Sequence, residues 1–176
     1  EDAAMQGVER YKVRLVPHDE RWHDEFLTVR ARIQALWNEA VVDIQHFGST
    51  SIHGIWAKPI LDIAVVVKSF DAMDAGAMKR AGYDDCGLQD PDRSRYLFVL
   101  RGEGGLSLHH IHCYLPDDAD FKRCVGFRDY LNSHPEAAQA YSELKRKLAE
   151  TYPDDRFAYT DAKWEFVQSI YARLDG

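Results

Sequence analysis

The chain has 176 residues, enough for one domain with a sizeable core, and its apolar and charged fractions are ordinary for a globular protein. Its net charge of −7 predicts no broad nucleic-acid-binding surface, so an anionic ligand needs a local basic pocket. No apolar run approaches the ~18 residues of a membrane span. The three cysteines form no CxxC pair, which indicates reduced thiols and a cytoplasmic protein.

Strand and helix patterns alternate in the first half of the chain. Residues 1–10 are too charged for a signal peptide and are expected to be frayed, so the single domain is predicted over 11–176. Residues 11–16 alternate like a strand, and Asp19 is expected to cap the helix that follows. The inward face of that helix is predicted to be Trp22, Phe26, Val29, Ile33, Leu36 and Trp37.

Two strands and a hairpin complete the predicted sheet. Residues 41–47 are expected to be a strand, and the β-branched run at 60–67 a central strand covered on both faces. A short helix is predicted within 69–83. The runs at 96–102 and 106–115 flank a Gly-rich turn and indicate a β-hairpin.

The remaining third is predicted to be helical. One helix is expected over 120–131, and a capping box of Ser133 and Glu136 is expected to open a second. Thr160 is expected to cap a third, with an inward face of Trp164, Val167, Ile170, Tyr171 and Leu174. A sheet built early with helices packed against it late predicts an α+β fold.

One acid interrupts the apolar strand at 60–67. Asp62 shares a face with Ile60 and Ala64, so it points where a small side chain leaves room. Upstream, the turn of Gly48, Ser49 and Thr50 offers hydroxyls and N–H groups to an anion, above all if a helical turn begins directly after it. The alternative is that the turn residues only cap and that Asp62 only bonds backbone.

A pair of histidines indicates a second part of the same site. His110 and His112 stand two apart on a predicted strand and share a face, whereas His109 points the other way. Two such imidazoles suit a divalent metal or a phosphate, and a structural role is the alternative. If their strand neighbours that of Asp62, the three side chains are expected to converge.

Inward cations on the late helices indicate an anion-binding wall. Arg128, Lys145 and Lys163 fall on or near apolar stripes, with Tyr141 one turn before Lys145. Inward cations are costly unless they are paired or face a polar cavity. The alternative is that each extends to solvent at a helix edge or pairs with a nearby acid such as Asp129 or Asp161.

The sequence resembles the GrpB family of the nucleotidyltransferase-fold superfamily. The resemblance rests on five stretches, which are VRLVPHDERWHDEF, HFGSTSIHGIWAKPILDIAVVV, LHHIHCYL, FRDYLNSHPEAAQAYSELKRKLA and YTDAKWEFV. They extend from residue 13 to residue 167, nearly the whole chain. The resemblance implies a nucleotidyltransferase-like mixed sheet followed by helices.

The sequence departs from the acid pattern that this resemblance implies. A typical nucleotidyltransferase has two acids spaced one apart on its strand and a third on a neighbouring strand; here Ile60 and Asp62 fill the first two places, and His110 or His112 the third. Two-metal catalysis needs several carboxylates. One aspartate and two histidines instead suggest a single site for a softer ion such as zinc, manganese or iron. The expected cofactor is a divalent ion, with Mg²⁺, Mn²⁺ and Zn²⁺ as the candidates.

The resulting expectation is an enzyme that acts on a nucleotide or a phosphorylated small molecule, with neither nucleic acid nor membrane as partner. Asp62, His110 and His112 are the predicted catalytic and metal-binding residues. The predicted anion-binding residues are Gly48, Ser49, Thr50, Lys58, Arg128, Tyr141, Lys145 and Lys163. The alternatives are a catalytically silent nucleotide- or metabolite-binding domain and a metal-dependent hydrolase or cyclase on the same fold.

Overall fold

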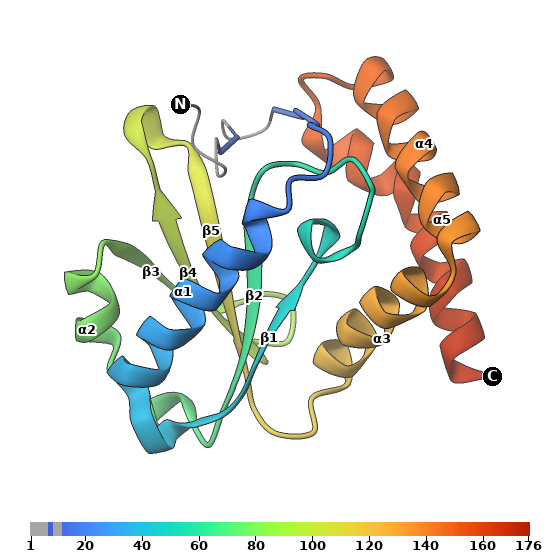
Figure 1. The fold of residues 1–176 in the computed structure, drawn as a ribbon. Helices are drawn as coiled ribbons and strands as arrows, with labels where there is room; N and C mark the ends of the chain where they lie inside the picture. Colours follow the sequence, from blue (N-terminus) through green and yellow to red (C-terminus); the bar gives the residue numbers. More distant parts are fainter. Residues whose placement is uncertain (1–6, 9–11) are drawn as a thin grey trace.

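The computed structural model describes residues 7–8 and 12–176 (Figure 1). The prediction of a frayed start is wrong for Val8, which is 4% exposed and pairs with Ser107; the rest of 1–10, apart from Gly7, lies outside the described residues. The predicted strand at 11–16 is also wrong, with Tyr11 outside the described residues. Its amide groups serve two distant loops instead, since Val13 donates to Pro153 and Val16 pairs with Ala57.

A five-stranded mixed sheet forms the centre of the molecule (Figure 1). Its order is β1-β2-β5-β4-β3, with β2 and β5 parallel and every other neighbour antiparallel. The strands are β1 (Val41–Phe47), β2 (Leu61–Val67), β3 (Tyr83–Gln89), β4 (Arg95–Arg101) and β5 (Ser107–Tyr114). The predicted α+β class, the hairpin of β4 and β5, and the placement of β1 and β2 are confirmed.

Strand β3 has no apolar run and was not predicted. Its sequence, YDDCGLQ, is polar because β3 is an edge strand with a bulge between Asp85 and Gly87. The helix predicted within 69–83 is correspondingly shorter. It consists of a 3₁₀ turn at Phe70–Ala72 and helix α2 (Ala75–Arg80).

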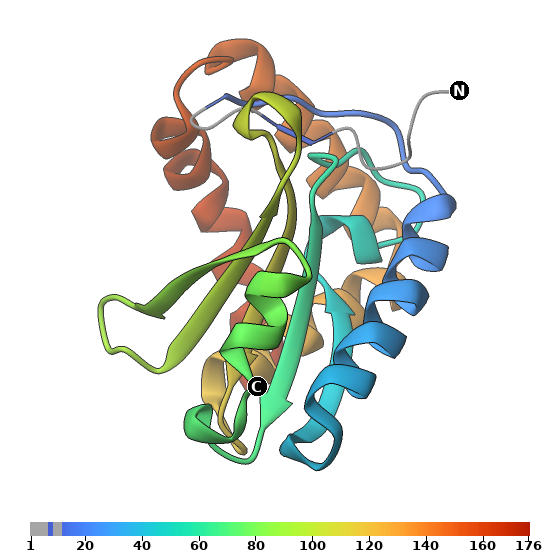
Figure 2. The ribbon, with the colours of Figure 1, turned by 90° about the vertical axis from the view of Figure 1, so that its left-hand side faces the viewer.

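Helix α1 (Arg21–Trp37) and α2 cover one face of the sheet (Figures 1 and 2). The Asp19 carboxylate accepts a hydrogen bond from the first amide of α1, and the predicted inward face is confirmed. This face packs on Leu61, Ile63 and Val65 of β2. Ala64 faces the opposite side with Phe47 and Tyr114, so β2 is covered on both faces, as predicted.

The other face is covered by α3 (Ala119–Ser133), α4 (Pro135–Thr151) and α5 (Arg156–Asp175) (Figure 1). The predicted capping box is wrong, because Ser133 ends α3 and His134 precedes α4 without a side-chain cap. The predicted cap at Thr160 is wrong because Asp155 caps α5 one turn earlier, accepting from the Ala158 amide at 3.0 Å.

The inward face of α5 is partly as predicted. Val167 and Ile170 are buried, but Trp164 and Leu174 are 48% and 37% exposed. Of the described helices, none has both the length and the apolar character required to cross a bilayer.

Candidate functional site

Parallel pairing of β2 and β5 brings Asp62, His110 and His112 together. The register sets Asp62 beside His110, and His112 lies on the same face of β5. His112 Nε2 lies 3.1 Å and His110 Nδ1 3.6 Å from Asp62 Oδ1. One donor atom from each residue lies within 4.8 Å of the others, so the predicted convergence is confirmed. His109 occupies the opposite face, where it contacts Tyr83 and Glu25.

The charges in this cluster suit a cation. Burial alone raises the pKa of Asp62, but the adjacent His110 and the hydrogen bond from His112 together outweigh burial and hold that pKa below its usual range. Burial lowers the pKa of His112, and Asp62 only partly opposes this effect. The cluster therefore holds one carboxylate oxygen and two imidazole nitrogens, a donor set that fits a single divalent ion.

In the ligand-free protein, the surroundings of the two ring nitrogens determine which tautomer His112 adopts. His112 Nδ1 is buried and has no hydrogen-bond partner among the described residues, whereas Nε2 faces Asp62. A neutral imidazole carries one N–H, so that proton belongs on Nε2, where it is donated to Asp62. If Nε2 ligates a metal, the proton must move to Nδ1. This tautomer costs free energy, because the buried Nδ1–H has no hydrogen-bond acceptor in the part of the chain that the structure describes.

The turn at Gly48 lies directly against Asp62. Gly48 has φ +72° and ψ −176°, and a Cβ there would lie 2.7 Å from Asp62 Oδ2. A 3₁₀ turn spans Ser49–Ser51, earlier than the predicted helical turn. The amides of Ser51 and Ile52 bond to the Gly48 and Ser49 carbonyl oxygens, so the turn itself uses these two donors. Ser49 and Thr50 line the cavity described next.

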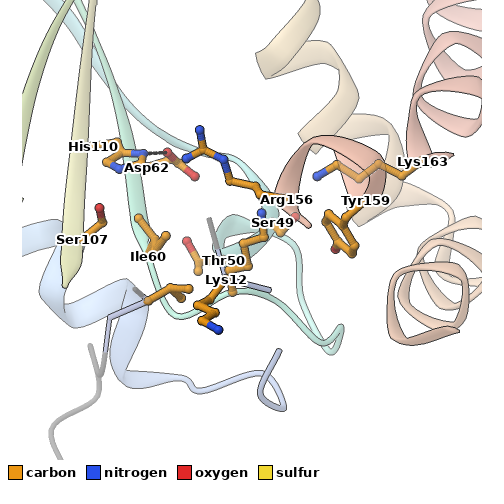
Figure 3. Close-up of a pocket in the computed structure, with 12 residues that line it drawn as sticks. Lys12, Ser49, Thr50, Ile60, Asp62, Ser107, His110, Arg156, Tyr159 and Lys163 are labelled. Carbon is orange, nitrogen blue, oxygen red and sulfur yellow. Dashed lines mark ion pairs between the residues drawn. The ribbon is translucent and has the colours of Figure 1, made fainter. Parts of the chain in front are cut away.

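A cavity of about 170 Å³ opens between the sheet and α5 (Figure 3). Asp62 and His110 line its strand side, and Arg156 and Lys163 line it from α5. Its other lining residues are Val8, Lys12, Ser49, Thr50, Lys58, Ile60, Ser107 and Tyr159. The sheet thus supplies a carboxylate and an imidazole, while the opposite wall is cationic. We call this the cationic cavity.

A second cavity, of about 320 Å³, shares Ser49, Asp62 and Lys163 with the first. Its wall is aromatic, from Phe47, Phe127, Tyr141, Trp164 and Tyr171, and Gly48, His112, Cys124, Thr160 and Val167 complete it. The predicted residues Gly48 and Tyr141 therefore lie in this aromatic cavity. An elongated ligand with an anionic end and a ring at the other end can occupy both.

Three lysines cluster around two tyrosine rings. Lys58 and Lys163 Nζ lie 4.8 Å and 5.1 Å from the centre of the Tyr159 ring. Lys145 Nζ lies 4.7 Å from the Tyr141 ring centre, and Lys145 is only 1% exposed. Burial, aided by the charge of Lys163, lowers the pKa of Lys58 to about 8. Burial and the charges of Lys163 and Lys58 lower the pKa of Lys145 well below its usual range.

Arg128 lies apart from the other predicted anion-binding residues. It lines neither cavity, and its guanidinium donates to the His46 carbonyl oxygen at 2.7 Å and to Gln45 Oε1 at 2.9 Å. It also pairs with Asp129. These bonds commit Arg128 to holding α3 against β1.

Two residues in or beside the site were missed in the sequence. Arg156 precedes the helix start predicted at Thr160, although Arg156, Tyr159 and Lys163 share one helical stripe once α5 begins at Arg156, after its cap Asp155. His46 is 8% exposed, stacks on Phe26 and bonds the Thr50 hydroxyl at 2.8 Å. Burial lowers the pKa of His46 to about 4, so His46 is neutral. The alternation of β1, which buries Ile44 and His46, is the signal for His46.

Comparison with known proteins decides the family. The family model described as GrpB protein matches residues 12–173. The glutamate-rich protein GrpB of Alkalihalophilus pseudofirmus is 36% identical over 170 residues, which cover 94% of this chain and 98% of that protein. The chain belongs to the GrpB family.

Solved structures agree with the GrpB assignment. A crystal structure of the conserved protein GrpB from Enterococcus faecalis superposes with a TM-score of 0.82 and 28% identity, covering 91% of this chain and 96% of that one. Terminal uridylyl transferase 4 from Trypanosoma brucei, solved with bound dUTP, superposes at 0.54 with 12% identity over 90% of this chain and 54% of that one. The GrpB fold is therefore a nucleotidyltransferase fold.

Proposed function

We propose that this GrpB-family chain is an enzyme that binds a nucleotide, or a similar phosphorylated small molecule, across the two cavities with one divalent ion. The observation that carries the proposal is the convergence of Asp62, His110 and His112 at the edge of a cavity whose opposite wall holds Lys58, Arg156 and Lys163. Paired with a metal, such a cationic wall suits a phosphate chain.

Each wall has a distinct role in this proposal. The Ser49 hydroxyl donates to phosphate oxygens, and Lys58 and Lys163 neutralise them. The aromatic cavity accepts the ring of a nucleoside by stacking and burial. Transfer of a nucleotidyl group is the reaction that the fold suggests, supported by the uridylyl transferase that shares it.

Asp62, His110 and His112 would hold the ion. Two imidazoles favour Mn²⁺ or Zn²⁺ over Mg²⁺, which prefers oxygen ligands. A bound divalent ion supplies Lewis-acid polarisation of a phosphoryl oxygen and a lowered pKa for bound water or hydroxyl. Because Gly48 has no side chain, the turn lies directly against Asp62, and phosphates bound at the turn can approach the ion position.

A metal-free site is the second candidate, and the His112 tautomer favours it. Because His112 Nε2–H is donated to Asp62, no lone pair of His112 faces a metal there, and Asp62 can instead orient His110, which lines the cationic cavity, for proton transfer. The site then serves a binding domain or a hydrolase that uses acid–base chemistry alone.

Metal titration separates the two candidates. In the first, chelator-treated wild-type protein binds one equivalent of Mn²⁺ or Zn²⁺ in calorimetry, and Asp62→Asn weakens this binding at least ~100-fold. The same metal raises the thermal shift produced by nucleoside triphosphates and is required for their turnover. His53→Gln is the control, since this histidine is exposed and lies outside the cluster.

Two results bear against the first candidate. Equal metal affinity in wild type and Asp62→Asn contradicts the metal site and leaves the Asp–His pair. Absence of any nucleotide-induced thermal shift, with and without metal, contradicts the nucleotide proposal itself.

A further inference from the structure

Lys145 is the least compensated polar group in the described part of the chain. Its side chain is 1% exposed, and Nζ has no hydrogen-bond partner there. An ammonium ion buried without a counter-charge costs several kcal/mol, whereas a desolvated cation–π contact such as that with Tyr141 supplies about 2 kcal/mol. The contact is therefore too weak to keep the amine charged.

The groups around Lys145 make a charge there still less favourable. On its own helix it faces the Tyr141 ring. The charges that act on it come from Lys163 on α5 and Lys58 before β2, and both have its sign. Among the described residues no carboxylate appears with them. Lys145 itself lines neither cavity, but Lys58 and Lys163 line the cationic one.

We propose that Lys145 is a neutral amine in the free protein and takes up one proton from solvent when a polyanion binds between Lys58 and Lys163. This inference rests on the proposed function and adds the charge class of the ligand, which is a di- or triphosphate rather than a monoanion. The anion removes the repulsion from Lys58 and Lys163 and supplies the missing counter-charge, so the protonated amine becomes the stable form.

The sign of the pH dependence follows. A complex that holds one more proton than its separated components weakens as pH rises, by up to tenfold per pH unit for one proton. Lys58 contributes little at pH 7, because its pKa of about 8 leaves it mostly protonated there. Proton uptake at pH 7 therefore reports on Lys145.

The test is calorimetric titration with inorganic tripolyphosphate, with chelator present, in two buffers of different ionisation enthalpy at pH 7. The difference in heat gives the number of protons taken up. We expect wild type to take up about one proton more than Lys145→Met, and the variant to bind at least ~10-fold more weakly. We also expect Lys145→Met without ligand to melt at a higher temperature, because an apolar group replaces an unpaired buried amine.

Lys147→Met is the matched control, since Lys147 is exposed on the same helix. It should match wild type in affinity, melting temperature and proton uptake. If Lys145→Met does not fold, wild-type affinity between pH 6 and 7 decides, because Lys58 stays mostly protonated there and the inference requires the affinity to fall as pH rises.

Equal proton uptake in wild type and Lys145→Met overturns the inference, as does a failure of tripolyphosphate to bind wild type. Neither result contradicts the proposed function if the protein still binds metal and nucleotide. Conversely, proton uptake with tripolyphosphate stands even if no nucleotide binds, so the two failures are distinguishable.

Discussion

At the scale of the residue, Gly48 shows how little space the site has. Its backbone conformation is one that side-chain-bearing residues rarely adopt, and the nearest atoms to an added Cβ belong to Asp62. Glycine is thus required here for two reasons: the backbone has a positive φ, and the Asp62 carboxylate leaves no room for a Cβ. His46 acts on the opposite side of the turn by bonding the Thr50 hydroxyl.

The variant Gly48→Ala should lose the site as well as stability. We expect the free energy of unfolding to fall by about 1–3 kcal/mol from backbone strain. Metal and polyanion binding should be abolished, because the methyl group displaces the Asp62 carboxylate. Urea denaturation and calorimetry measure the two effects.

Gly87→Ala separates strain from displacement. Gly87 has a similar φ of +69°, but an added Cβ meets nothing within 4 Å. This control should lose stability and keep ligand binding. Normal binding in a folded Gly48→Ala protein would contradict the role given to the turn.

At the scale of the element, α5 positions most of the wall opposite the sheet. Arg156, Tyr159 and Lys163 line the cationic cavity from its first two turns, and Trp164 and Val167 line the aromatic one. The start of this helix therefore fixes both walls. Asp155 determines that start by accepting from the Ala158 amide.

Removing this cap should loosen the wall. Asp155→Ala is expected to lower the free energy of unfolding by ~1 kcal/mol, the usual value of an N-cap. Amide hydrogen exchange should quicken in the first turn of α5, with weaker tripolyphosphate binding. Asp161→Ala, an exposed position inside the same helix, should change stability by less than ~0.5 kcal/mol. If the two variants behave alike, Asp155 does not set the helix start.

At the scale of the whole molecule, the site lies between two layers with separate cores. One core joins the sheet to α1 and α2; another joins Ile52 and Ile55 to α3, α4 and α5. The loop from Gly48 to Ile60 carries the turn and Lys58, and it enters the second core through these isoleucines. Correct placement of Lys58 and Ser49 against α5 thus depends on packing between layers.

Ile55→Ala tests this dependence. Ile55 is fully buried, so the truncation should cost about 2–5 kcal/mol. We expect tryptophan fluorescence and far-UV circular dichroism to give one coincident urea transition at a lower midpoint, because both layers pack on the same sheet. Val42→Ala, at a residue 54% exposed, should leave the midpoint nearly unchanged. Separate transitions by the two probes would show that the layers unfold independently.

Local patterns in the sequence determined the elements with strong periodicity. The stripe of α1, the strands β1 and β2, and the hairpin of β4 and β5 follow from apolar spacing. The alternation along β2 and β5 also fixed the faces of Asp62 and His110. These features are readable because period and turn chemistry act between residues near in sequence.

Only the tertiary structure decided what those faces meet. The parallel register of β2 with β5, across an intervening hairpin and helix, sets Asp62 beside the histidines. Packing of α5 brought Arg156 into the cavity, whereas contacts with β1 removed Arg128 from it. The polar edge strand β3 likewise depends on a neighbour for its hydrogen bonds. Long-range pairing and layer packing leave no periodic signal in the chain. The sequence therefore indicated which residue types could carry the chemistry, and the tertiary structure determined which of those residues lie in the site.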